Sequence, residues 1–311
     1  MATKTFIIAG GGISGLTLRY YLSKKFPSLR IELYEQKSLL GGCIQTHSSP
    51  NLFEQGPRTF KVSRSKSLLK LINDLGLSDE MIYSDPSANR RYIYKDNKLN
   101  KVSLFSPIFL KCIPALFKEW SVSPGPDQET IDHFARRRFS PFVATTLIDP
   151  LVKGIFGGSS CTLSVSACFP QLKKMEKDYG SITAGLLKTY SGNQERGLFT
   201  LKNGAYSLIK ALKEQGRGPI YTSKALNHIP KSQKIFLALP KNGLQSLFSH
   251  DLKMFNLLKK IKSVDLNVVN LYYNRPCLNY KGFGYLVPSF EKQKIMGVVF
   301  DSSIFPQQNT L

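Results

Sequence analysis

Residues 6–15 read FIIAGGGISG, and this stretch decides the fold of the amino-terminal part of the chain. Its four apolar residues, Phe6 to Ala9, predict a short strand of the kind that is buried in a parallel sheet. Gly10, Gly12 and Gly15 follow in the G-x-G-x-x-G spacing, and the residues after them predict a helix. A tight turn, close approach of the backbone to a pyrophosphate and close packing of helix on strand each require one of these glycines.

An acidic residue stands where this motif needs one. Residues 30–34 (RIELY) predict a second strand, and Glu35 follows it, about 20 residues after Gly15. A carboxylate at this position accepts hydrogen bonds from ribose hydroxyls, whereas the alternative is a solvated glutamate at the end of a strand. Because strand, turn, helix, strand and acid occur in order, we favour dinucleotide binding over an ordinary glycine-rich turn.

Chain length and net charge limit the number of structural units and the classes of binding partner. A chain of 311 residues suggests two or three structural units. Its formal net charge of +22 suits nucleic acid, an anionic membrane surface or an acidic substrate. Since no nucleic-acid-binding motif accompanies the charge, we expect no nucleic-acid partner. A generally basic, solvated surface is the alternative explanation.

The cysteines and histidines predict neither disulfides nor a metal site. The five cysteines are scattered, with no C-x-x-C pair, and the four histidines have no ligand spacing. We therefore expect a reduced, cytoplasmic protein without metal. No signal peptide is expected at the amino terminus, and no apolar run is long enough to span a membrane.

One apolar segment could contact a membrane surface. Residues 104–117 read LFSPIFLKCIPALF and are interrupted by two prolines and a lysine. They could form an interfacial segment with Lys118 and Trp120 at the headgroup level, on the inner face of the cell membrane. A buried helix in an accessory unit is the alternative.

Periodicity predicts the other elements. We expect the run Arg136–Arg138 to lie on a solvated helix face, and Val264–Tyr273 to be the longest strand. The remaining predictions are helices over residues 65–75, 128–142 and 205–215, a hairpin of 91–95 with 98–102, and strands over 220–229, 235–240, 281–288 and 295–300.

Five stretches, in this order, resemble the flavin-dependent protoporphyrinogen and coproporphyrinogen oxidases of the monoamine oxidase and phytoene desaturase superfamily. They are GGGISGL (10–16), LYEQKSLLGG (33–42), FEQGPRTF (53–60), GIFGGSSCTLSVSACFP (154–170) and GFGYLVPSFE (282–291), the last followed by MGVVFDSSIFP (296–306). The first two are shared across the superfamily, while the others are narrower. The resemblance spans almost the whole chain.

The resemblance implies oxidation of a porphyrinogen with FAD as the cofactor. In the family the flavin N5 accepts hydride from the macrocycle and O2 then regenerates the flavin, giving H2O2. No catalytic side chain is expected, because the cofactor carries the chemistry. The residues that match the family's cofactor site are Gly10, Gly12, Ser14, Gly15, Glu35, Gly41 and Gly42.

Two further residues match the family's substrate site. Arg58 matches the arginine of the GPR motif, which faces a substrate propionate, and a bidentate carboxylate clamp suits its guanidinium. Phe283 matches the aromatic residue of the GFG motif, which packs on a pyrrole ring. The resemblance also implies that the protein can attach to a membrane surface.

The predicted fold class is α/β (α+β overall). We expect a Rossmann-like FAD-binding domain from residues 1–62 and 195–242, and a mixed-sheet substrate domain from 63–103 and 243–311. Residues 104–194 would form a helical insertion. The sequence does not predict an oligomeric state.

Two departures from the family pattern affect these expectations. Family members usually continue beyond the position of Leu311, so we expect a carboxy-terminally shortened form. The segment between Ala225 and Ile235 is also shorter than the family's hairpin, whose strand contacts the adenine. Two alternatives therefore stay open: another amine-oxidase-like or desaturase-like flavoenzyme, and an inactive shortened homologue.

Overall fold

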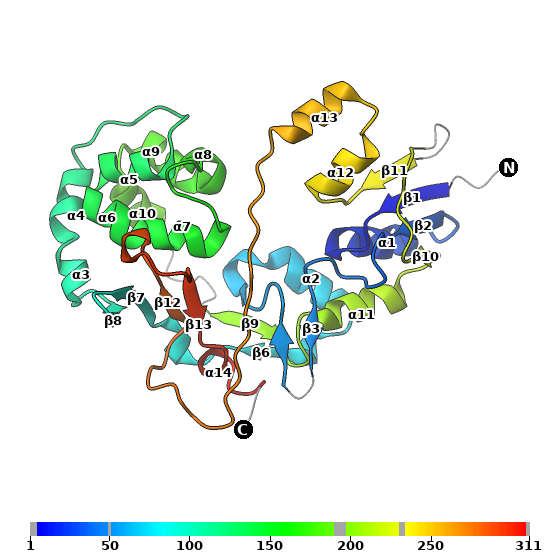
Figure 1. Cartoon of the computed structure of the whole chain (residues 1–311), viewed down its shortest axis with the longest axis horizontal. Helices are drawn as coiled ribbons and strands as arrows, with labels where there is room; N and C mark the ends of the chain where they lie inside the picture. Colours follow the sequence, from blue (N-terminus) through cyan, green and yellow to red (C-terminus); the bar gives the residue numbers. More distant parts are fainter. Residues whose placement is uncertain (1–4, 49–50, 190–196, 230–233, 309–311) are drawn as a thin grey trace.

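A four-stranded parallel sheet forms one end of the molecule (Figure 1). The computed structural model describes residues 5–48, 51–189, 197–229 and 234–308. The strand order is β10 (Ile220–Tyr221), β2 (Arg30–Tyr34), β1 (Thr5–Ala9) and β11 (Lys234–Leu237), so β1 lies at the centre. Ile8 is in register with Leu33 on one side and Phe236 on the other. This is the arrangement that the first 35 residues predict.

Helices α1 (Ile13–Lys25) and α11 (Tyr206–Gln215) pack beside this sheet (Figure 1). Their apolar faces and the strands share one core, in which Ile8, Leu16 and Leu212 have no exposed surface. Both helices agree with the sequence prediction. Burial of the apolar faces therefore fixes the position of the turn between β1 and α1.

A second sheet lies at the middle of the molecule and is mixed. Its order is β13 (Gly297–Val299), β12 (Gly284–Leu286), β7 (Arg91–Lys95) and β8 (Lys98–Val102). The predicted hairpin of β7 and β8 is confirmed, with positive φ angles at both turn residues, Asp96 and Asn97. The pair β12 and β13 is antiparallel, whereas β12 and β7 are parallel.

The remaining strands and helices outside the helical unit are short. The strands are β3 (Thr46–His47) with β4 (Phe53–Glu54), and β5 (Phe60–Lys61) and β6 (Met81–Tyr83) on either side of β9 (Leu198–Leu201). The helices are α2 (Lys66–Asp74), α12 (Lys241–Leu247), α13 (Leu252–Lys259) and α14 (Asp301–Ile304), with 3-10 turns η1 (Val62–Arg64), η2 (Ser78–Glu80), η3 (Pro86–Asn89) and η5 (Ser289–Glu291).

The helical unit lies at the opposite end from the parallel sheet (Figure 1). It contains α3 (Pro107–Leu110), α4 (Ile113–Glu119), α5 (Ile131–Arg138), α6 (Pro141–Val143), the π-helix η4 (Ala144–Ile148), α7 (Asp149–Phe156), α8 (Val165–Cys168), α9 (Pro170–Tyr179) and α10 (Ile182–Thr189). The predicted fold class, with its helical insertion, is therefore confirmed. The exact domain boundaries stay predictions.

The solvated helix face predicted at Arg136–Arg138 is wrong for its last residue. Arg138 is fully buried and donates to Glu119 at 3.2 Å and to Glu176 at 2.7 Å. Arg137 also donates to Glu176, at 2.7 Å, while Arg136 lies outside and pairs with Asp132. Carboxylates from α4 and α9 explain the burial, because a charged side chain enters a core only when it is paired.

The strand predicted over Val264–Tyr273 is also wrong. The segment is extended, but none of its backbone groups forms a hydrogen bond with the backbone of another described residue. It crosses the middle of the molecule as a strap (Figure 1), with Val269 77% and Leu271 70% exposed. An alternating pattern specifies an extended chain, yet a strand also needs a neighbour. The strand predicted over 220–229 is shorter, since Ser223 has a φ of 54° and turns the chain.

Candidate functional site

The glycine turn after β1 has the geometry that the motif requires. Gly10 has a φ of 109°, which favours glycine, and its N–H donates to Tyr34 O at 2.8 Å. A Cβ at Gly15 would lie 1.9 Å from the carbonyl oxygen of Gly10, so only glycine allows α1 to start this close to the strand. Gly12 differs, because a Cβ there would meet nothing within 4 Å.

The start of α1 is open toward the same space. Gly12 is the N-cap residue and no side chain caps the helix. Ser14 lies in the first turn and is exposed. A helix of 13 residues with an uncapped amino terminus offers N–H groups and partial positive charge to a phosphate. An open backbone beside Gly12 therefore fits a pyrophosphate.

A second glycine turn runs along the first one. Gly41 N donates to Gly11 O at 2.8 Å, and Gly41 forms a parallel bridge with Gly12. Gly41 and Gly42 have φ angles of 104° and 60°, and a Cβ at Gly42 would approach only the Cα of Gly12, at 3.5 Å. The structure thus brings together both glycine motifs that the sequence pointed to.

Glu35 lies beside the glycine turn, where two backbone N–H groups bind its carboxylate. Its Oε2 accepts the N–H of Gly11 at 2.7 Å, and its Oε1 accepts the N–H of Lys37 at 2.8 Å. The carboxylate is half-buried and uses one lone pair on each oxygen. The remaining acceptor capacity suits ribose hydroxyls, and the two backbone bonds hold the carboxylate in place for them.

Arg58 lies in a small cluster of charges between the sheets. Its guanidinium pairs with Asp301 at 2.6 Å and reaches Glu54 O at 3.4 Å. Burial raises the pKa of Asp301, and the Arg58 charge acts against this effect. The predicted carboxylate clamp therefore already holds a carboxylate of the chain itself. Sequence reasoning missed Asp301, although it directly follows the predicted strand at 295–300.

Glu54 forms the buried side of this cluster. Its carboxylate accepts the N–H of Ala205 at 2.6 Å and the hydroxyl of Thr46 at 2.8 Å. Burial raises its pKa, and these two hydrogen bonds act in the opposite direction. Asn270 of the strap donates to Glu54 O at 3.1 Å. The cluster therefore ties the strap to the amino-terminal unit.

Phe283 lies one residue before β12 and is half-buried. The guanidinium carbon of Arg91 is 4.0 Å from the centre of its ring. The carbonyl of Phe283 accepts the N–H of Phe300 at 2.9 Å, and Asp301 follows Phe300. Arg58 and Phe283 are thus placed in one region through β12 and the residues after β13. No sequence motif singles out Arg91, which reads as an ordinary strand residue.

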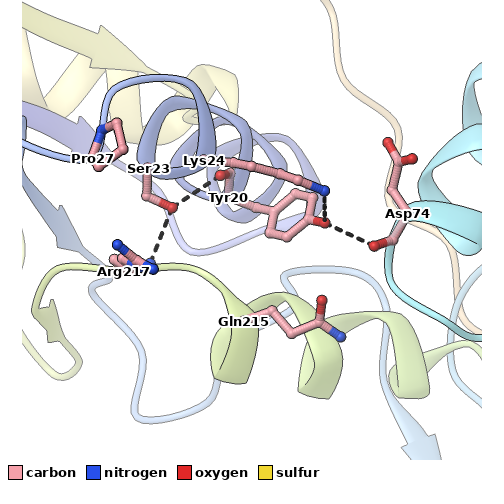
Figure 2. A pocket seen from close by; sticks show the side chains of 7 residues that line it. All are labelled: Tyr20, Ser23, Lys24, Pro27, Asp74, Gln215 and Arg217. Atoms are coloured by element: carbon pink, nitrogen blue, oxygen red, sulfur yellow. Dashed lines mark hydrogen bonds between the residues drawn. The ribbon is translucent and has the colours of Figure 1, made fainter.

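A surface pocket of about 300 Å³ lies at the other end of α1 (Figure 2). Tyr20 OH donates to Asp74 O at 2.8 Å across it, and Lys24 donates to Tyr20 OH at 3.2 Å. Its lining contains both charge signs and comprises Tyr20, Ser23, Lys24, Pro27, Asp74, Gln215 and Arg217. Since α1 separates it from the glycine turn, this pocket is not part of the cofactor site.

The parallel sheet, the paired glycine turns and the strand-end carboxylate define a dinucleotide-binding flavoprotein fold with a second, mixed sheet. The family model for flavin-containing amine oxidoreductases matches residues 13–309. The chain belongs to this family, and its cofactor is FAD. Among the described residues, no group of three or more His, Cys, Asp or Glu could hold a metal ion.

The curated relatives reported below are all named protoporphyrinogen oxidases. The chain is 31% identical to protoporphyrinogen oxidase of Bos taurus over 356 residues, which covers 98% of this chain and 74% of the relative. It is 30% identical to the Homo sapiens protein, with the same two coverages, and 27% identical to that of Dictyostelium discoideum, with 96% and 73%. The predicted family resemblance is therefore confirmed.

Solved structures show the same fold. A protein from Exiguobacterium sp. 255-15, provisionally assigned as a protoporphyrinogen oxidase, superposes with a TM-score of 0.82 at 20% identity. The match covers 100% of this chain and 75% of that one. Reduced UDP-galactopyranose mutase superposes with a TM-score of 0.59 at 10% identity, covering 84% and 61% of the two chains.

The expected shortening between Ala225 and Ile235 falls partly on residues outside the described ranges. The alignments with relatives are 356 residues long or more in the examples above, although this chain has 311 residues, so they contain gaps on its side. Residues 230–233 lie outside the described part of the chain. The shortened adenine hairpin therefore stays a prediction.

Proposed function

We propose that this protein oxidises a porphyrinogen to a porphyrin with FAD as cofactor and O2 as electron acceptor, in haem biosynthesis. The similarity to protoporphyrinogen oxidases over 98% of the chain carries the proposal. The glycine turns, Glu35 and the aromatic–arginine pair in the middle of the molecule support it. The substrate would be protoporphyrinogen IX or coproporphyrinogen III, since the net charge of +22 suits both anions.

The residues of the chain would bind and orient, rather than react. Bound FAD supplies the hydride acceptor. The uncapped start of α1 would hold the pyrophosphate, and Glu35 the ribose. Phe283 would offer an apolar face to the macrocycle, and the rate gain would come from holding the substrate in a fixed orientation toward the bound cofactor. No general base is assigned.

The proposed reaction balances without a further reactant. Each of three oxidations removes one hydride and one proton from the macrocycle. One O2 accepts the two electrons and two protons, and leaves as H2O2. Three O2 molecules are therefore consumed, and three H2O2 formed, for each porphyrin.

To test this proposal, the FAD-loaded protein is incubated with each porphyrinogen, once in air and once without oxygen. A separate incubation contains a neutral primary amine instead of a porphyrinogen. We expect porphyrin fluorescence to rise in air, with three H2O2 for each porphyrin. Oxidation of the amine instead would favour another amine-oxidase-like enzyme. Protein that stays colourless with added FAD would indicate an inactive homologue.

We also propose that the helical unit touches an anionic membrane surface on the cytoplasmic side. No helix in the described ranges is long and apolar enough to cross a membrane. The segment 104–117 buries one face, including Ile108 and Cys112, and exposes another. Phe105 is 90% exposed and Phe117 77%, and basic residues accompany them. The buried face agrees with the interpretation as a helix of an accessory unit, and the exposed apolar face supports the proposed contact with a membrane surface.

Binding to vesicles tests this second proposal. Phe105→Ser with Phe117→Ser should reduce cosedimentation with vesicles that contain anionic lipid. Leu252→Ser is the matched control, because Leu252 is 75% exposed on α13, outside the helical unit. Equal binding of the unaltered protein, the double variant and the Leu252→Ser variant would contradict a membrane contact through this segment.

A further inference from the structure

We propose that the pocket between α1, α2 and the turn after α11 binds a small linear dicarboxylate, which Lys24 holds at one end and Arg217 at the other (Figure 2). The pocket lies at the carboxy-terminal end of α1, whereas the glycine turn lies at the amino-terminal end. The inference therefore concerns a second ligand, and it does not depend on the proposed oxidation of a porphyrinogen.

The floor of the pocket is buried and forms its hydrogen bonds within the chain. Tyr20 and Ser23 are each 4% exposed. The hydroxyl of Tyr20 donates to Asp74 O at 2.8 Å, and the hydroxyl of Ser23 donates to Tyr20 O at 2.9 Å. Because these bonds join α1 to the end of α2, the pocket is formed without a ligand, as most small-molecule sites are.

The turn that carries Arg217 is held in place by a buried arginine of α1. Nη2 of Arg19 donates to Gly216 O at 2.8 Å and to Gly218 O at 2.7 Å, on either side of Arg217. The backbone N–H of Arg217 also donates to Ser23 Oγ at 3.2 Å. The backbone of Arg217 is therefore fixed beside the pocket, although its side chain is exposed.

Arg19 also removes an electrostatic obstacle to an anion. The last carbonyl groups of a helix carry partial negative charge, and α11 ends at Gln215 in the lining of the pocket. Nη1 of Arg19 donates to two of these carbonyl oxygens, Leu212 O at 3.4 Å and Lys213 O at 3.3 Å. The end of α11 is thus compensated by a cation that is not itself available to a ligand.

Two cations of the lining keep their binding capacity. Within residues 5–48, 51–189, 197–229 and 234–308, neither Lys24 nor Arg217 forms an ion pair. Lys24 Nζ donates one bond, of 3.2 Å, to the hydroxyl of Tyr20 and has two further N–H groups. The guanidinium of Arg217 forms no hydrogen bond with the same residues, so its whole fork can bind a carboxylate.

The acidic residue of the lining, Asp74, already has a partner. Its Oδ2 accepts the hydroxyl of Tyr21 at 2.7 Å. Burial and this bond raise the pKa of Tyr21 to about 12, so the phenol stays protonated and continues to donate at neutral pH. Two cations face one engaged carboxylate, and the pocket therefore favours an anion over a cation.

The positions of the two cations indicate the shape of the ligand. Figure 2 shows the ammonium of Lys24 beyond the hydroxyl end of Tyr20, whereas Arg217 lies on the opposite side of that residue, beside Ser23. One carboxylate at each cation, joined by a short methylene chain along the Tyr20 ring, would satisfy both charges. The volume of about 300 Å³ is at the lower end for ligand pockets and fits such a small molecule.

The experiment titrates FAD-saturated protein with glutarate at constant ionic strength and measures the heat of binding. Butyrate is the monocarboxylate probe. We expect one saturable site for glutarate, and at least about tenfold weaker binding of butyrate, because one charge-assisted hydrogen bond is missing. The flavin absorbance should not change during the titration, since the pocket lies at the far end of α1.

Three variants locate the site. Lys24→Met and Arg217→Gln should each weaken binding of glutarate at least about tenfold, through loss of the charge at one end. Lys25→Met is the matched control: Lys25 is also exposed at the end of α1, but its ammonium lies over the Phe26 ring and outside the lining. It should change the affinity by no more than about twofold. Circular dichroism of each variant shows whether it is folded.

Thermal unfolding gives a second measurement. Glutarate should raise the Tm of the unaltered protein, and raise that of Lys24→Met less, because a ligand that binds only the folded state stabilises it. Absence of saturable binding up to about 10 mM glutarate would overturn the inference. So would butyrate binding as tight as that of glutarate, displacement of FAD, or an equal loss of affinity in Lys24→Met and Lys25→Met, which would reflect only the general positive charge.

Discussion

Gly12 and Gly15 provide a sharp test of the cofactor site, because adding one methyl group should have opposite effects at the two positions. Gly12 has a φ of −75° and a ψ of 180°, which any residue can adopt, and its added Cβ would meet nothing within 4 Å. We expect Gly12→Ala to lower the free energy of unfolding by no more than about 1 kcal/mol, the usual cost of alanine at an N-cap.

The same methyl group should weaken binding of the cofactor. It would stand beside the uncapped start of α1, where the pyrophosphate needs to approach the backbone. Each charge-assisted hydrogen bond that is lost costs about 1.5–3 kcal/mol, so the affinity for FAD should fall at least about tenfold. Titration with FAD, followed by quenching of flavin fluorescence, measures this loss.

Gly15→Ala is the matched change with the opposite result. Its Cβ would lie 1.9 Å from the carbonyl oxygen of Gly10, and α1 would have to move away from β1. We expect a destabilisation of about 1–3 kcal/mol or more, even without FAD, measured by denaturant unfolding. The reasoning is refuted if Gly12→Ala binds FAD normally, or if Gly15→Ala is as stable as the unaltered protein.

Three further changes probe the charges. Glu35→Gln should destabilise the protein by about 1 kcal/mol in chemical unfolding, because one of the two backbone N–H groups that Glu35 binds loses its acceptor. If the affinity of this variant for FAD is unchanged, Glu35 makes no contact with the ribose. A double-mutant cycle of Arg58→Ala and Asp301→Ala should give a coupling of about 1 kcal/mol, and a value near zero would show that the pair is incidental. Burial alone would raise the pKa of Glu176, but bonds from its cationic neighbours lower it from 4.5 to about 2. Its contribution to stability is therefore complete above about pH 4.5 and is lost as the pH falls toward 2, and Glu176→Gln should flatten this part of an acid-unfolding curve.

Local sequence determined the cofactor-binding unit almost completely. Strand, glycine turn, helix, second strand and Glu35 lie within the first 35 residues, and each feature depends on residue type and short-range spacing. The hairpin of β7 and β8 and the helix at 66–74 follow from the same kind of information. These elements were predictable because their hydrogen bonds and turns are made by residues close together in the chain.

Tertiary structure decided the charges and the pairing of distant segments. Arg58 and Asp301 are 243 positions apart, and no pattern along the chain shows that they form an ion pair. Arg138 carries the same charge as Arg136, but carboxylates brought from α4 and α9 allow only Arg138 to be buried. The pattern of Val264–Tyr273 predicts an extended chain, yet sheet formation depends on a neighbour that only the folded molecule can supply. Sequence sets the local conformation of a residue, whereas its electrostatic and hydrogen-bond partners depend on how distant segments pack.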